Sequence, residues 1–99
     1  MPAEVLLVED ADVHVEFMRL AFGRPGPMVR LEVARDGESA LAHLAAHPDR
    51  PPALMVLDLG LPRMSGFDVL HAVRTHGSDR VRRVPVVVLT TSSAPDDIQ

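Results

Sequence analysis

A chain of 99 residues with 46% hydrophobic residues is large enough to form one domain around a single hydrophobic core. It contains no cysteine, which excludes disulfides, thiolate metal sites and thiol nucleophiles and favours a reducing, cytoplasmic location. The net charge of -4 and the absence of Trp and Tyr argue against a nucleic-acid groove, and no apolar stretch approaches the roughly 20 residues of a membrane span.

Strand and helix patterns alternate along the chain. Short apolar or alternating segments predict four strands, at residues 5–8, 29–33, 54–57 and 84–89. Apolar residues at helical spacing predict amphipathic helices over residues 13–21, 40–47 and 65–77, and a capping pattern at Ser93 begins a fourth. The repeating residues of the first helix are Val13, Phe17, Leu20 and Ala21. This alternation predicts an α/β fold with a parallel sheet and one domain over residues 1–99.

Acidic or hydroxyl side chains directly follow three of the predicted strands. Glu9 and Asp10 follow the first, Asp58 the third, and Thr90 and Thr91 the fourth. Because the carboxyl ends of parallel strands share one edge of the sheet, we expect these groups to converge. Clustered carboxylates repel one another unless a cation joins them, and a few hard oxygen ligands suit Mg²⁺ together with a phosphoryl group. A carboxylate beside Mg²⁺ can attack phosphorus and become an acyl phosphate, with a hydroxyl and backbone amides as donors to the phosphoryl oxygens.

Each of these groups also has a purely structural interpretation. Acids after a strand often only keep a loop hydrated, and the hydroxyls that follow the fourth strand are typical of helix capping. Asp58 fits this interpretation less well, because it lies between two leucines and a buried acid needs a partner. The five histidines lie on helix patterns without partner acids, so we expect them at the surface, with His14 nearest the site. The arginines at 80, 82 and 83 predict a solvated loop before the fourth strand.

The chain resembles the receiver domain of two-component response regulators through the segments VLLVED, VARDGESAL, VLDLGLPRMSGFDVL and PVVVLTTSS. It is most similar to the stand-alone type that serves phytochrome-like histidine kinases. The resemblance implies a flavodoxin-like, doubly wound parallel sheet with strand order 2-1-3-4. The family also has a fifth strand, a lysine and a fifth helix, and this sequence contains no lysine. We therefore expect the domain to be incomplete at its C-terminus, with the apolar edge of the fourth strand covered by further residues or by a second chain.

The resemblance also implies a role for each site residue. Asp58 is the residue phosphorylated by a sensor histidine kinase or a phosphotransfer protein. Mg²⁺ is bound by Asp10, Asp58 and the carbonyl of Gly60, and Glu9 supports it through water. The phosphoryl group is contacted by Leu59, Gly60, Thr90 and Thr91, of which Thr90 is the switch hydroxyl.

The implied function is a signalling switch that acts through protein partners and is not an enzyme. It leaves room for a homodimer and involves neither nucleic acid nor membrane. A receiver-like module that binds partners without phosphorylation is the alternative, although the retained carboxylates speak against it. A phosphatase of the haloacid dehalogenase type needs a second acid where Gly60 stands, and a flavin phosphate would be repelled by Glu9 and Asp10.

Overall fold

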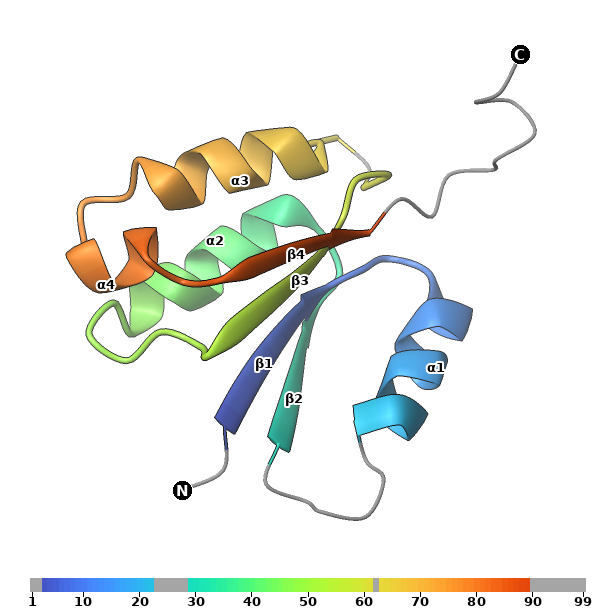
Figure 1. Cartoon of the computed structure of the whole chain (residues 1–99). Coiled ribbons are helices and arrows are strands. Elements are labelled where there is room, and N and C mark those ends of the chain that lie inside the picture. The colour runs from blue at the N-terminus through green and yellow to red at the C-terminus, as the bar shows by residue number, and fades with distance from the viewer. Residues whose placement is uncertain (1–2, 23–28, 62, 90–99) are drawn as a thin grey trace.

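The computed structural model describes residues 3–22, 29–61 and 63–89. The described strands form one parallel sheet in the order β2-β1-β3-β4. They are β1 (Ala3–Val8), β2 (Val29–Ala34), β3 (Leu54–Asp58) and β4 (Val86–Leu89). The helices are α1 (Asp12–Phe22), α2 (Gly37–Ala46), α3 (Gly66–Arg74) and α4 (Asp79–Arg82), and none of these described helices is long and apolar enough to cross a membrane. Figure 1 shows helices on both faces of the sheet, so the predicted doubly wound architecture and strand order are confirmed.

The two faces of the sheet bury separate apolar clusters, because successive side chains of a strand point to opposite faces. One cluster joins the sheet to α2, α3 and α4, and its buried strand residues are Leu6, Val8, Ala34, Met55 and Leu57. The other joins the sheet to α1, and its buried strand residues are Val5, Leu7 and Val56. The central strands β1 and β3 are apolar at successive positions because both of their faces are covered.

The helix predicted after the first strand is present, but the apolar stripe that indicated it lies on its exposed side. Val13, Phe17 and Leu20 are 71%, 69% and 68% exposed. Val15 is buried instead, and Met18 and Phe22 pack with it against the sheet. Both sets of residues recur at helical spacing, so the sequence period does not decide which set contacts the core.

A short helix, α4, stands where the sequence predicted a solvated arginine loop. The Ser78 hydroxyl caps it by accepting a hydrogen bond from the Val81 backbone N–H, and Val81 itself is fully buried. The Arg80 guanidinium donates a hydrogen bond to the backbone carbonyl of Asp49, which is distant in the sequence. The basic residues therefore lie around one turn of helix, which packs against the core through Val81.

The predicted fourth strand is confirmed over Val86–Leu89 and lies at the edge of the described sheet. Among the described residues β4 pairs with β3 alone, so its other edge is open. Val87 and Val88 are 48% and 38% exposed, as expected for an apolar edge strand with a neighbour on one side.

The start of α3 packs directly on the end of β3. Ser65 and Asp68 form a capping box, which confirms the predicted cap. A Cβ on Gly66 would lie 2.8 Å from the carbonyl oxygen of Asp58 and 2.8 Å from the Cα of Leu59. These are backbone atoms, so they cannot yield without moving the strand end that carries Asp58. Only glycine allows this close approach.

Candidate functional site

Three acidic residues meet at the carboxyl end of β1 and β3. Val8 lies opposite Leu57 in the register of these strands, so the residues that follow Val8 lie beside Asp58. One carboxylate oxygen each from Glu9, Asp10 and Asp58 lies within 4.8 Å of the others. The predicted convergence of the three acids is therefore confirmed.

The acids differ in burial, and Glu9 is the most enclosed. Glu9 and Asp58 are 2% and 3% exposed, whereas Asp10 is at the surface. The Ala11 backbone N–H donates to Oε2 of Glu9 over 3.2 Å. Burial raises the pKa of Glu9, and the charge of Asp58 raises it further. The hydrogen bond from Ala11 and the neighbouring His14 imidazole lower the pKa of Glu9 but oppose the rise only in part.

The raised pKa of Glu9 predicts a pH-dependent cost to stability when no divalent ion is present. The folded protein holds the Glu9 proton more tightly than the unfolded chain, in which the pKa is near 4.5. The stabilising contribution of this group is therefore fully present below 4.5 and is lost as pH rises through the folded pKa. In EDTA, we expect the unfolding free energy of Glu9→Gln, relative to that of wild type, to increase as pH rises from about 4 to 8. Urea unfolding followed by circular dichroism measures this, and a difference that is constant with pH would contradict it.

A backbone donor faces the Asp58 carboxylate. The Gly60 N–H donates to Oδ1 of Asp58 over 3.0 Å. The Leu59 N–H is used elsewhere, because it donates to the Leu89 carbonyl of β4 over 3.1 Å. Of the two predicted phosphate-binding residues that follow Asp58, this geometry favours the amide of Gly60 and does not support that of Leu59.

The predicted hydroxyl groups, Thr90 and Thr91, lie outside the described residues, as does the capping pattern at Ser93. The last described residue of β4, Leu89, lies opposite Asp58 in the β3–β4 register. The carboxyl end of β4 therefore belongs to the same edge of the sheet as the three acids. The roles of the threonines and of the Gly60 carbonyl stay predictions.

The donor set fits a divalent cation of hard character. Glu9, Asp10 and Asp58 offer only carboxylate oxygens, and they are the one group of three or more potential ligand residues that the described part of the chain brings together. Two of these carboxylates are buried, and burial together with the charge of Asp58 raises the pKa of Glu9. A divalent ion would offset the negative charge of the carboxylates, and carboxylate oxygens are the ligands that Mg²⁺ and Mn²⁺ prefer.

Two histidines contact acids, contrary to the sequence prediction that none has an acidic partner. His14 Nδ1 lies 3.4 Å from Oε2 of Glu9. His43 Nε2 lies 3.7 Å from Oε2 of Glu4. The place of His14 in the first turn after the acid pair was a usable signal for its contact. No local signal existed for His43, because its partner lies in a distant strand.

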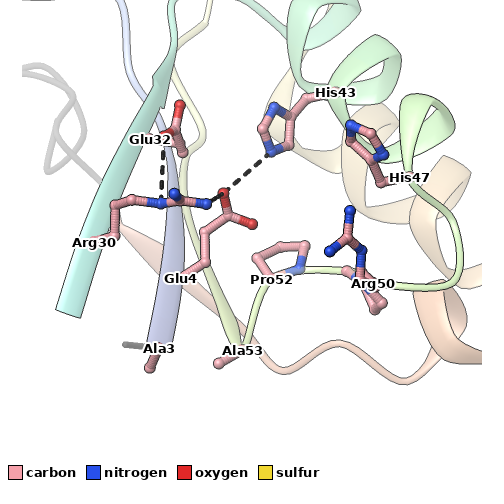
Figure 2. Close-up of a pocket in the computed structure, with 10 residues that line it drawn as sticks. Ala3, Glu4, Arg30, Glu32, His43, His47, Arg50, Pro52 and Ala53 are labelled. Atoms are coloured by element: carbon pink, nitrogen blue, oxygen red, sulfur yellow. Dashed lines mark hydrogen bonds and ion pairs between the residues drawn. The ribbon is translucent and has the colours of Figure 1, made fainter. Parts of the chain in front are cut away.

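A polar pocket lies at the opposite, amino-terminal end of the sheet. This polar pocket has a volume of about 520 Å³. Figure 2 shows the Glu4 carboxylate between Arg30 and His43, with His47 and Arg50 along the other side. Glu4 is paired with Arg30 over 3.5 Å and with His43 over 3.7 Å. The pocket thus holds paired charges of both signs, unlike the like-charged cluster at the carboxyl edge.

The comparisons with known proteins agree with this geometry. The family model of the response regulator receiver domain matches residues 5–99. The chain is 42% identical over 101 residues to the probable methanogenesis regulatory protein FilR2 of Methanothrix harundinacea, covering 99% of this chain and 64% of that protein. It therefore spans less than two thirds of the length of FilR2.

Two solved structures are close in fold. The phosphorylated cyanobacterial phytochrome response regulator RcpA is 31% identical with a TM-score of 0.83, covering 99% of this chain and 71% of that one. A Mn²⁺-bound form of the response regulator Rcp1 is 34% identical with a TM-score of 0.80, covering 98% and 71%. The chain belongs to the response regulator receiver domain family, a family of phosphorylation switches that bind a divalent metal ion.

Proposed function

We propose that Asp58 accepts a phosphoryl group from a histidine kinase or a phosphotransfer protein, and that this modification switches the contacts of the chain with protein partners. The observation that carries the proposal is the buried Asp58 carboxylate, clustered with Glu9 and Asp10 at the carboxyl edge of the sheet. The similarity to the phosphorylated form of RcpA supports it, because that relative is itself phosphorylated.

The transfer is a displacement at phosphorus. A carboxylate oxygen of Asp58 forms the new P–O bond while the P–N bond to the donor imidazole breaks, and that imidazole nitrogen keeps the bonding electron pair. The Gly60 N–H, already 3.0 Å from Oδ1 of Asp58, is placed to donate to a phosphoryl oxygen. Hydrolysis of the acyl phosphate by water resets the switch.

Mg²⁺ is the metal ion that we assign to the three acids. Asp10, Asp58 and the Gly60 carbonyl would hold it directly, and the buried Glu9 would hold it through water. When bound, the ion neutralises charge on the phosphoryl oxygens, which the carboxylates would otherwise repel. The Mn²⁺-bound form of the similar protein Rcp1 supports the binding of a divalent ion by this chain.

Thr90 is the group that we assign to sensing the phosphoryl group, with Thr91 as a further donor. The position of Leu89 opposite Asp58 supports this, since the next residue of the chain follows at the same edge. We also assign residues 1–99 to one receiver domain and place it in the cytoplasm, with protein partners only. The edge of β4 that no described strand covers, with Val87 and Val88 exposed, supports contact with a second copy.

Incubation with acetyl phosphate and Mg²⁺, followed by intact mass spectrometry, tests the proposal. We expect one phosphoryl adduct in wild type and none in Asp58→Asn, which keeps the shape of the side chain but removes its nucleophilic carboxylate. Adduct formation should also be lost in EDTA. A wild-type protein without adduct, or an adduct that persists in Asp58→Asn, would leave the phosphorylation-independent binding module as the better account.

A further inference from the structure

His14 approaches the metal cluster from the first turn of α1. Its Nδ1 lies 3.4 Å from Oε2 of Glu9, just beyond the usual range of a hydrogen bond. This nitrogen is shielded from water and has no hydrogen bond among the described residues. The rest of the side chain reaches the surface, where 44% of it is exposed. A buried polar nitrogen without a partner is uncommon, so its place beside a buried carboxylate calls for a reason.

The Glu9 carboxyl group is held from several sides. The Ala11 N–H donates to Oε2 over 3.2 Å, which is the same oxygen that His14 approaches. Asp58 contacts Glu9 from the cluster itself, through its charge and a side-chain hydrogen bond. Oε2 is thus the oxygen of Glu9 that has backbone and imidazole neighbours. The position of Oε2 determines which way the other carboxyl oxygen of Glu9 points.

We propose that His14 is a positioning residue for the divalent ion, because its Nδ1–H fixes Oε2 of Glu9 and so leaves the other carboxylate oxygen free for the metal's water shell. This inference rests on the proposed function, which places a divalent ion among the three acids. A small side-chain rotation that shortens the 3.4 Å separation of Nδ1 and Oε2 completes the bond. Pairs of histidine and carboxylate around metal sites commonly set ligand orientation in this way.

The expected effect is on metal affinity and not on folding. Partners of direct ligands typically alter metal affinity 10- to 100-fold. Because Glu9 acts through water, we expect His14→Ala to weaken Mg²⁺ binding by the lower of these values, about 10-fold. Asn carries an amide nitrogen close to the position of Nδ1, and we expect His14→Asn to recover most of the loss. His71→Ala is the matched control, since His71 is an exposed histidine on α3, away from the cluster.

Isothermal titration with Mg²⁺ at about pH 8, where an ordinary histidine is neutral, measures the affinity of each variant. Urea unfolding in EDTA, followed by circular dichroism because the chain has no Trp or Tyr, measures the fold without metal. The expected result is weaker Mg²⁺ binding in His14→Ala, recovery in His14→Asn, wild-type binding in His71→Ala and nearly equal unfolding curves for all four proteins.

Two results would overturn the inference while leaving the proposed function intact. One is an Mg²⁺ affinity in His14→Ala equal to or tighter than that of wild type. The other is a loss of affinity that matches an equal loss of metal-free stability and is not recovered by His14→Asn, since this is the pattern of a structural residue. Absence of Mg²⁺ binding by wild type would instead remove the metal from the proposed function and the inference with it.

Discussion

Asp10→Asn is expected to weaken Mg²⁺ binding by at least about 100-fold, because a direct ligand contributes more than the outer partners that alter affinity 10- to 100-fold. Asp10 is the exposed member of the acidic cluster, so its replacement leaves the packing of the sheet unchanged. The neutral amide keeps an oxygen but removes the charge that attracts the ion. Phosphorylation of Asp58 by acetyl phosphate should slow in parallel. Isothermal titration and the rate of adduct formation measure the two effects.

Asp12→Asn is the matched control for this prediction. Asp12 is an exposed acid two residues further along, and it is paired with Arg35 outside the cluster. We expect its replacement to leave Mg²⁺ affinity unchanged. Equal losses in the Asp10 and Asp12 variants would point to a general effect of surface charge. The assignment of Asp10 as a ligand would then be wrong.

Gly66→Ala is expected to destabilise the fold and to disturb the site together. The added Cβ would lie 2.8 Å from both the Asp58 carbonyl oxygen and the Leu59 Cα, so the backbone after β3 must shift. Overpacking of this kind costs about 1–3 kcal/mol of unfolding free energy. Because the shift occurs at Asp58, phosphorylation should also slow by more than the lost stability explains. Urea unfolding and the rate of adduct formation, measured on the folded fraction, test both effects.

Gly77→Ala separates this steric effect from the general consequence of replacing a glycine. A Cβ on Gly77 meets no atom within 4 Å. We expect its unfolding free energy to stay within about 0.5 kcal/mol of wild type, with an unchanged phosphorylation rate. Similar behaviour of the two alanine variants would refute the close approach of α3 to the end of β3.

The sheet was predictable from the sequence because its central strands are apolar without interruption. Residues 54–57 form such a run, as expected for a strand covered on both faces, and the strand β3 ends at Asp58. The buried side of α1 was not predictable, because Val13, Phe17 and Leu20 recur at the same spacing as the residues that contact the sheet. Periodicity identifies a helix, but tertiary packing selects its face. The short helix α4 was missed because four residues are too few for a period.

The acidic cluster was predictable because it depends on topology alone. Parallel strands carry the residues after their carboxyl ends to one edge, so Glu9, Asp10 and Asp58 had to meet if the sheet was right. Hydrogen-bond directions were not predictable. Whether Leu59 or Gly60 turns its amide toward Asp58 depends on where β4 pairs, and the Leu89 carbonyl takes the Leu59 amide. The contact of His14 with Glu9 depends likewise on how α1 leaves the strand.

The central claim is that Asp58 carries the phosphoryl group, and reductive trapping tests it most directly. A first hydride from borohydride displaces phosphate from the acyl carbon of an aspartyl phosphate and gives an aldehyde. A second hydride, followed by a proton from water, converts the aldehyde to an alcohol and leaves homoserine at the modified position. After treatment with acetyl phosphate and Mg²⁺, peptide mass spectrometry should find homoserine at position 58 and at no other acid, and in EDTA it should find none. Reduction of a phosphorylated Asp10 would also give homoserine, whereas reduction of a phosphorylated Glu9 would give hydroxynorvaline, so the product is mapped at each acid separately. A phosphoryl group on any residue other than Asp58, or trapping at Asp58 that does not need a divalent ion, would contradict it.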